Sequence, residues 1–218
     1  MITASGRNCW QHDEGVPSLR DIGQGLGRIS RFAGQTVEWY PVLAHVLTVA
    51  TIVPPIAAIY GLFHDAPEAM TSDVPTPWKA KEQRELEHKL YERMCRAYGL
   101  PWPVPPEIQK EVEEGDYQAL IAEAYVMGHS SPQGCVRRLE GGDETVVIGQ
   151  VPYLDVVAEL TKHNHAKALA RVGNHPLPAF MIPEVSRAVF REAFLHFHAK
   201  SREAGLEVTD VQDAALLD

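Results

Sequence analysis

The segment from His64 to Trp78, H-D-A-P-E-A-M-T-S-D-V-P-T-P-W, holds the densest set of side chains that could do chemistry. His64 and Asp65 are adjacent, and Glu68 follows His64 by four residues, which would place both on one face of a helix. An imidazole beside a carboxylate suits a divalent metal ion, and a second carboxylate nearby suits proton transfer. The segment therefore predicts a metal-dependent hydrolase.

The His64-Asp65 pair is flanked by apolar residues, in the run I-Y-G-L-F-H-D-A-P-E-A-M. Burying such polar groups costs several kcal/mol unless something binds them, which favours a metal at this pair. His45 also lies in an apolar stretch, where a lone histidine is more often a hydrogen-bonded core residue. For a ligand from a later helix Asp116 is the best candidate and Asp155 a weaker one, although Asp116 could instead cap a helix.

Several cations lie near these residues in the sequence: Arg28, Arg31, Lys79, Lys81 and Arg84. Arg28 and Arg31 would be one turn apart on a helix, and the other three follow the proline-rich turn. Such residues usually form a solvated face. In an acidic chain, a cationic cluster near a metal site would instead neutralise phosphate oxygens.

The 218-residue chain has the composition of a globular protein, with 45% hydrophobic residues. Its net charge of −9 opposes nonspecific binding to nucleic acid. The three cysteines lie far apart without a C-x-x-C motif, which fits a reducing cytoplasm better than a disulfide framework or a structural zinc site. The polar first 15 residues show no signal-peptide pattern, and polar residues and prolines interrupt the longest apolar run, so we expect no membrane association.

Helical patterns dominate the chain and predict an all-α fold in a single domain, 1–218, with a core at about 18–128. Helices are expected at about 18–32, 40–53, 56–70, 79–98, 107–127, 151–172 and 183–204. Ser18 would cap the first helix, and Gly115 could interrupt the fifth. Glycines and a β-branched run predict a loop with room for a small β-hairpin at 129–150, followed by two C-terminal helices of unassigned role and a frayed end.

The set His45, His64-Asp65 and Asp116 resembles the H…HD…D ligand set of the HD-domain metal-dependent phosphohydrolases. Longer runs are similar as well: T-A-S-G-R at 3–7, R-I-S-R-F-A-G-Q-T at 28–36, Y-P-V-L-A-H at 40–45 and the run at 64–79. They resemble the branch with the bacterial YfbR-like 5′-deoxynucleotidases and the phage HD hydrolases, among them dATP triphosphohydrolases. The resemblance covers about residues 3–128. The other H-D dipeptide, His12-Asp13, lies in the polar N-terminal segment, and we interpret it as a chance match with no role in the site.

The resemblance implies a helical HD domain whose metal ligands would be His45, His64, Asp65 and Asp116. Glu68 would handle the proton, Asp73 would contact the sugar, and Arg31 (or Arg28) and Lys79 would contact phosphate. This ligand set suits a divalent transition metal such as Co, Mn, Zn or Fe, and a second divalent ion could arrive with the substrate phosphates. The chain departs from the family pattern in carrying Ala44 and Val46 around the first histidine, and in its short spacing of 19 residues between the two histidines.

The favoured function is a triphosphohydrolase that cleaves a dNTP, of the dATP kind, to deoxynucleoside and triphosphate. The alternative is a 5′-deoxynucleotidase acting on dNMPs, and a remoter one is an inactive HD fold that senses nucleotides. Lys81 and Arg84 favour the triphosphate, because three phosphates need more neutralisation than one. Asp73, in a turn with Pro75 and Pro77, would favour deoxyribose, although it could simply cap the turn. The expected partner is a small deoxynucleotide, and the expected assembly is a cytoplasmic homo-oligomer, a dimer or higher.

Overall fold

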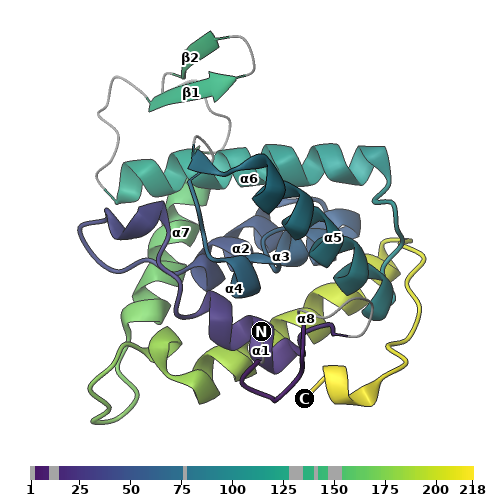
Figure 1. Ribbon diagram of the computed structural model, residues 1–218. Helices are drawn as coiled ribbons and strands as arrows, with labels where there is room; N and C mark the ends of the chain where they lie inside the picture. Colours follow the sequence, from purple (N-terminus) through teal and green to yellow (C-terminus); the bar gives the residue numbers. More distant parts are fainter. Residues whose placement is uncertain (1–2, 10–14, 76–77, 128–134, 140–141, 147–153) are drawn as a thin grey trace.

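The computed structural model describes residues 3–9, 15–75, 78–127, 135–139, 142–146 and 154–218, and it confirms an all-α bundle with a small hairpin (Figure 1). The α-helices in the described part are α1 Leu19–Leu26, α2 Val42–Ile52, α3 Ala58–Phe63, α4 Glu68–Thr71, α5 Lys81–Ala97, α6 Pro106–Val126, α7 Leu154–Leu169 and α8 Pro183–Glu203. The hairpin pairs β1 Cys135–Leu139 antiparallel with β2 Gly142–Val146, inside the segment predicted for it. None of the helices in the described ranges is both long and apolar enough to cross a membrane.

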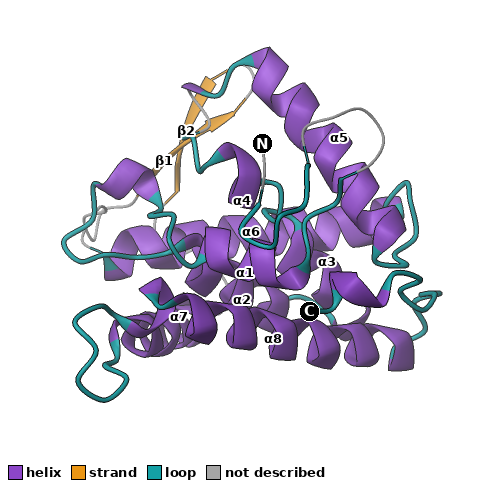
Figure 2. Ribbon diagram, turned by 60° about the horizontal axis from the view of Figure 1, so that its bottom comes forward, coloured by secondary structure: helices purple, strands orange, loops and turns teal. Residues whose placement is uncertain are grey.

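Helix α8 belongs to the main core, whereas most buried apolar residues of α7 form a smaller cluster with α6. Helix α8 packs along α1 and α3, and α7 packs against α2 and α6 (Figure 2). The aromatic rings of Phe63, Tyr98 and Phe194 contact one another, with ring centroids 5.1 to 5.7 Å apart. Helices α7 and α8 therefore support α2, which carries His45, and α3, which leads into the turn with His64.

Helix α1 begins as predicted and ends earlier. Ser18 is its N-cap in a capping box with Asp21. The predicted extension to residue 32 is wrong, because the chain after Gly27 pairs with the segment that precedes α2: Arg31 N donates to Tyr40 O at 2.9 Å and Val42 N donates to Ile29 O at 3.0 Å. Arg28 and Arg31 therefore do not share a helical face.

The glycines of α1 are packing contacts. A Cβ at Gly23 would lie 2.7 Å from the Cβ of Phe190 on α8, and a Cβ at Gly25 would lie 2.8 Å from the Cβ of Ala69 on α4. The low helix propensity of glycine is offset here by the close approach that it allows. Helix α1 consequently packs closely against both α8 and α4, and α4 carries Glu68.

The expected helix 56–70 is divided at the residues of greatest interest. Helix α3 ends at Phe63 and α4 begins at Glu68, because Pro67 lacks the N–H that a continuous helix would donate to the Phe63 carbonyl. The Phe63 carbonyl instead accepts a hydrogen bond from Ala66 N at 2.9 Å. His64 and Asp65 therefore lie in a tight turn between two short helices and not within one helix.

Two further expectations are corrected. Helix α6 runs without a break through Gly115, whose α-carbon faces Val53, so Asp116 lies inside the helix and is not its cap. The C-terminal end is packed and not frayed: Leu216 is buried, and its carbonyl accepts a hydrogen bond from the hydroxyl of Tyr98 at 3.3 Å.

Asp21 ties the N-terminal segment to α1. Its carboxylate accepts hydrogen bonds from Ser5 N at 2.9 Å, from Ser5 Oγ at 2.6 Å and from Ser18 N at 3.2 Å. Burial alone would raise the pKa of Asp21, but the hydrogen bonds from Ser5 and Ser18 outweigh burial and lower the pKa below its ordinary value of 3.8. The Thr3–Arg7 segment thus has a structural role through Asp21.

Asp21→Asn is expected to lower the free energy of unfolding at pH 7 by about 1 to 3 kcal/mol, the cost typical of disrupting hydrogen bonds to a buried charge. Because the folded protein lowers this pKa, the ionised carboxylate stabilises the fold fully above pH 3.8 and progressively less as the pH falls through the folded pKa. Urea denaturation at pH 7 and at decreasing pH measures the difference, which should shrink in acid.

Asp210→Asn is the matched control, because the Asp210 carboxylate is 89% exposed and pairs with the half-exposed Arg202 at 2.9 Å. We expect that change to have little effect on stability. Equal stability of wild type and Asp21→Asn at pH 7 would contradict the role assigned to Asp21.

Candidate metal centre

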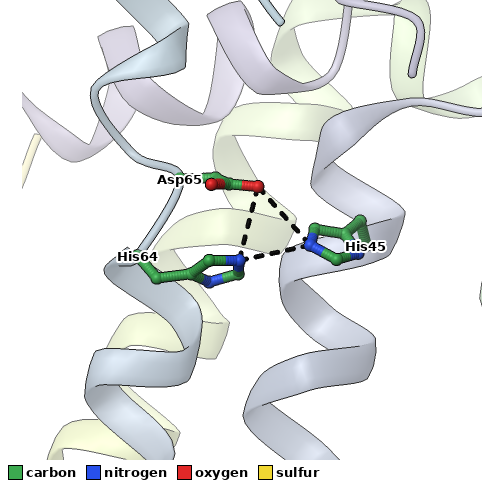
Figure 3. Close-up of side chains that lie close together, drawn as sticks. All are labelled: His45, His64 and Asp65. Carbon is green, nitrogen blue, oxygen red and sulfur yellow. Dashed lines mark hydrogen bonds and ion pairs between the residues drawn. The ribbon is translucent and has the colours of Figure 1, made fainter. Parts of the chain in front are cut away.

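Two histidines and an aspartate converge where α2 meets the turn after α3 (Figure 3). His45 Nε2 lies 3.2 Å from His64 Nε2, and Asp65 Oδ2 lies 3.4 Å from the first nitrogen and 3.3 Å from the second. One ligand atom from each residue falls within 4.8 Å of the others. This group could bind a metal ion.

Asp116 brings a fourth donor to the same point from α6. Its Oδ1 lies 3.1 Å from His45 Nε2 and 3.8 Å from His64 Nε2. Donors at about 2.1 Å from one ion and at right angles to each other are about 3.0 Å apart, so the spacing of these atoms fits a shared ion. Asp155, the weaker candidate, is exposed in the first turn of α7.

The cluster favours positive charge. Burial on its own would lower the pKa of His64, but the neighbouring carboxylates, Asp65 first, raise that pKa to about 10. Burial would likewise raise the pKa of Asp65, yet the adjacent His64 holds it well below its usual range. The carboxylates therefore stabilise a positive charge between the two imidazoles, as a bound cation would carry.

Glu123 is a buried acidic residue that the sequence analysis missed. It is fully buried on α6, and its Oε1 accepts hydrogen bonds from His45 Nδ1 at 2.7 Å and from the Tyr40 hydroxyl at 3.0 Å. A signal was present, because Glu123 follows Asp116 by seven residues, or two helical turns, within the apolar run A-L-I-A-E-A. An acid at that spacing lies on the same face of the helix as the metal-ligand candidate.

Arg31 bridges Glu123 and the histidine-aspartate cluster. Its Nε forms an ion pair with Glu123 Oε2 at 2.9 Å, and its Nη1 lies 3.6 Å from Asp65 Oδ2. The side chain is only 9% exposed, yet it lines a cavity beside the cluster. Its guanidinium is thus fixed by two carboxylates.

Glu68 and Lys79 lie on the other side of Asp65. Glu68 is buried, and its Oε1 accepts a hydrogen bond from Lys79 Nζ at 3.2 Å, while Lys79 also donates to Glu87 Oε2 at 2.9 Å. Glu68 Oε2 is buried and has no hydrogen-bond partner among the described residues. Burial, reinforced by the charge of Asp65, raises the pKa of Glu68 to about 8, so this carboxyl group exchanges a proton near neutral pH.

Two cavities meet at Asp65, Glu68 and Lys79. One of about 310 Å³ is also lined by Arg31, Phe32, Asp73, Val74, Pro75, Asp116 and Leu120. The other, of about 290 Å³, is also lined by His64, Pro67, Arg84, Glu87, His88 and Tyr91. The shared wall carries the predicted proton-transfer residue and one metal-ligand candidate.

The structure does not bring every predicted residue to these cavities. Arg28 Nε donates to Met181 O at 3.4 Å, and Lys81 is 84% exposed beside Glu85, so neither lines a cavity described above. Arg84 and Asp73 do line the cavities, one in each. The dipeptide interpreted as a chance match, His12-Asp13, and the turn residue Pro77 lie outside the described residues.

No protein-family model matches this chain. One similar protein is "Uncharacterized protein YfdR" of Escherichia coli (strain K12), 32% identical over 112 residues, which are 50% of this chain and 61% of that protein. Another is "Uncharacterized protein RCAP_rcc00048" of Rhodobacter capsulatus, 29% identical over 163 residues, which are 67% of this chain and 83% of that protein. The chain therefore matches about three fifths of the first relative's length, and neither name carries an activity.

Proposed function

We propose that the chain is a metal-dependent phosphohydrolase of deoxynucleotides, of the HD-domain kind that its motifs resemble. The observation that carries the proposal is the convergence of His45, His64, Asp65 and Asp116 next to the buried Glu68. The donor set of two imidazoles and two carboxylates fits Co, Mn, Zn or Fe better than Ca or Mg. Such an ion, when bound, would supply Lewis-acid polarisation of a phosphoryl oxygen.

Glu68 is the proposed proton carrier. Its unpartnered Oε2 and its pKa of about 8 suit a group that takes a proton from the attacking water and returns it to the leaving sugar oxygen. In that reaction the water oxygen bonds to phosphorus and the bond from phosphorus to the 5′ oxygen breaks. Lys79, held by Glu68 and Glu87, keeps the carboxyl group in place.

Arg31 and Lys79 are the proposed phosphate contacts. Both line the 310 Å³ cavity, and each is oriented by carboxylates before substrate arrives. Preorganised cations of this kind stabilise charge on phosphoryl oxygens without reorganising during the reaction. Arg28 is not needed in this scheme, because it contacts the Met181 carbonyl.

A dNTP is the preferred substrate in this proposal. The second cavity, with Arg84 and His88, extends beyond the shared wall and offers space for further phosphates. A 5′-deoxynucleotidase acting on dNMPs is the second candidate, favoured by the position of Lys81, which is exposed and pairs with Glu85. Because Lys81 lies outside both cavities, fewer positive charges face a bound triphosphate than the sequence indicated.

One experiment tests the function and separates the candidates. The protein loaded with Mn²⁺ or Co²⁺ is incubated with each dNTP and dNMP and with ATP and AMP, and the released phosphate species are identified. We expect triphosphate and deoxynucleoside from a dNTP, and little turnover of the ribonucleotides because Asp73, half-buried in the first cavity, would bind the 3′-hydroxyl in a close-fitting site. Asp73→Asn should reduce the preference for deoxyribonucleotides over ribonucleotides.

Other outcomes have distinct meanings. Phosphate released from dNMPs alone would favour the 5′-deoxynucleotidase. Equal turnover of ATP and dATP would exclude sugar selection through Asp73. No turnover of any nucleotide by protein that retains metal would contradict hydrolysis and favour the nucleotide sensor, and the metal-free protein serves as the control.

A further inference from the structure

Glu123 occupies an unusual position for an acidic residue. It is fully buried, and its two oxygens face three polar side chains: Tyr40, His45 and Arg31. Two of those three, His45 and Arg31, also contact the carboxylates of the candidate metal centre. The carboxylate thus contacts residues of the centre without being a member of the donor set.

Burying a carboxylate is costly unless it is paired and hydrogen-bonded. Arg31 pairs with one oxygen of Glu123, while His45 and Tyr40 donate to the other. A carboxylate beside Nδ1 fixes the imidazole proton on that nitrogen. Nε2 of His45 is then left with its lone pair directed at His64, Asp65 and Asp116, where a metal ligand is required.

We propose that Glu123 is the positioning residue of the metal centre: it holds His45 in the form that ligates through Nε2, and it anchors Arg31 beside Asp65. The inference rests on the metal site of the proposed function and adds a residue outside the ligand set. Glu123 lines neither of the cavities described above, so it acts through His45 and Arg31 and not on substrate.

The first test compares metal affinity in two glutamine variants. Apoprotein is titrated with Co²⁺ and the dissociation constant is read from the cobalt absorption bands. Glu123→Gln should raise the dissociation constant by about 10- to 100-fold, the usual effect of losing a partner behind a ligand. Glu114→Gln, the same change at an exposed position of α6 that contacts Gln118, should leave it unchanged.

Tyr40→Phe distinguishes an effect of Glu123 on metal binding from an effect on the stability of the fold. It removes one hydrogen bond to the same Glu123 oxygen and leaves the 2.7 Å contact with His45 intact. We expect a lower unfolding midpoint in Tyr40→Phe with a much smaller change in cobalt affinity than in Glu123→Gln. Cobalt affinity of wild-type strength in a folded Glu123→Gln would overturn the proposal.

A measurement on the wild type covers the case in which Glu123→Gln does not fold. Nitrogen-15 NMR of histidine-labelled protein reports which ring nitrogen is protonated and which binds added Zn²⁺. We expect His45 to keep its proton on Nδ1 and to show the zinc shift at Nε2. Zinc binding at Nδ1 would overturn the proposal. Because none of these three tests measures hydrolysis, failure of Glu123 as a positioning residue is distinguishable from failure of the proposed reaction.

Discussion

Glu68→Gln is expected to keep bound metal and to slow hydrolysis by about 100- to 10,000-fold, the range typical of losing a general acid or base. Glutamine preserves the size of the side chain and an oxygen that can accept from Lys79, but it cannot exchange a proton. Oε2 of Glu68 is buried and has no hydrogen-bond partner in the described part of the chain, so it is the atom that we expect to carry the proton. Metal content by elemental analysis and initial rates on the best substrate check both parts.

Glu87→Gln is the matched control. Glu87 contacts the same ammonium group at 2.9 Å, so the change perturbs Lys79 without removing the proposed proton carrier. A much smaller loss of rate is expected there. Wild-type turnover in Glu68→Gln would remove Glu68 from the mechanism, and equal losses in the two variants would assign its role to holding Lys79.

His64→Ala and Asp116→Ala are each expected to abolish tight metal binding, and hydrolysis with it. Each variant removes a donor from the cluster, which should cost more than the roughly 10- to 100-fold typical of residues behind the ligands. Elemental analysis after dialysis, compared with wild type, gives the occupancy. Full occupancy in both variants would contradict the assignment of the centre.

His88→Ala controls for loss of a nearby histidine, because His88 lines the second cavity and its ring contacts Trp102 at a tilted angle. Metal occupancy should stay at the wild-type value in that variant. Circular dichroism checks that the variants are folded, since His64 Nδ1 also contacts the Gly61 carbonyl at 2.8 Å.

The apolar surroundings of His64 and Asp65 indicated a polar site at that pair, whereas the full set with His45 and Asp116 came from the resemblance to the HD-domain phosphohydrolases. The sequence also predicted a long amphipathic helix at about 79–98, which is observed as Lys81–Ala97, and the cap at Ser18, because both depend on neighbours within one or two turns. The centre itself still required tertiary structure, because Asp116 reaches His45 only through the packing of α6 on α2.

The failed expectations depend on contacts distant in sequence. The end of α1 is set by backbone pairing with the segment before α2, and helix propensities carry no information about such pairing. Arg28 was interpreted with Arg31 as a pair because both were expected on one helix, and without that helix their side chains diverge. Glu123 was missed although it follows Asp116 by two helical turns, because its partners Tyr40 and Arg31 lie more than eighty residues away in the sequence and only the fold brings them to it.

The four donor residues come from three separate segments: α2, the turn after α3, and α6. An ion held by all four would be a cross-link that closes two loops of the chain, and the unfolded chain could not keep it. Thermodynamic linkage then makes folding depend on the free ion, with about 2.7 kcal/mol of added stability at a hundred times the dissociation constant. Metal supply during synthesis would accordingly govern how much folded protein accumulates, before any substrate is present.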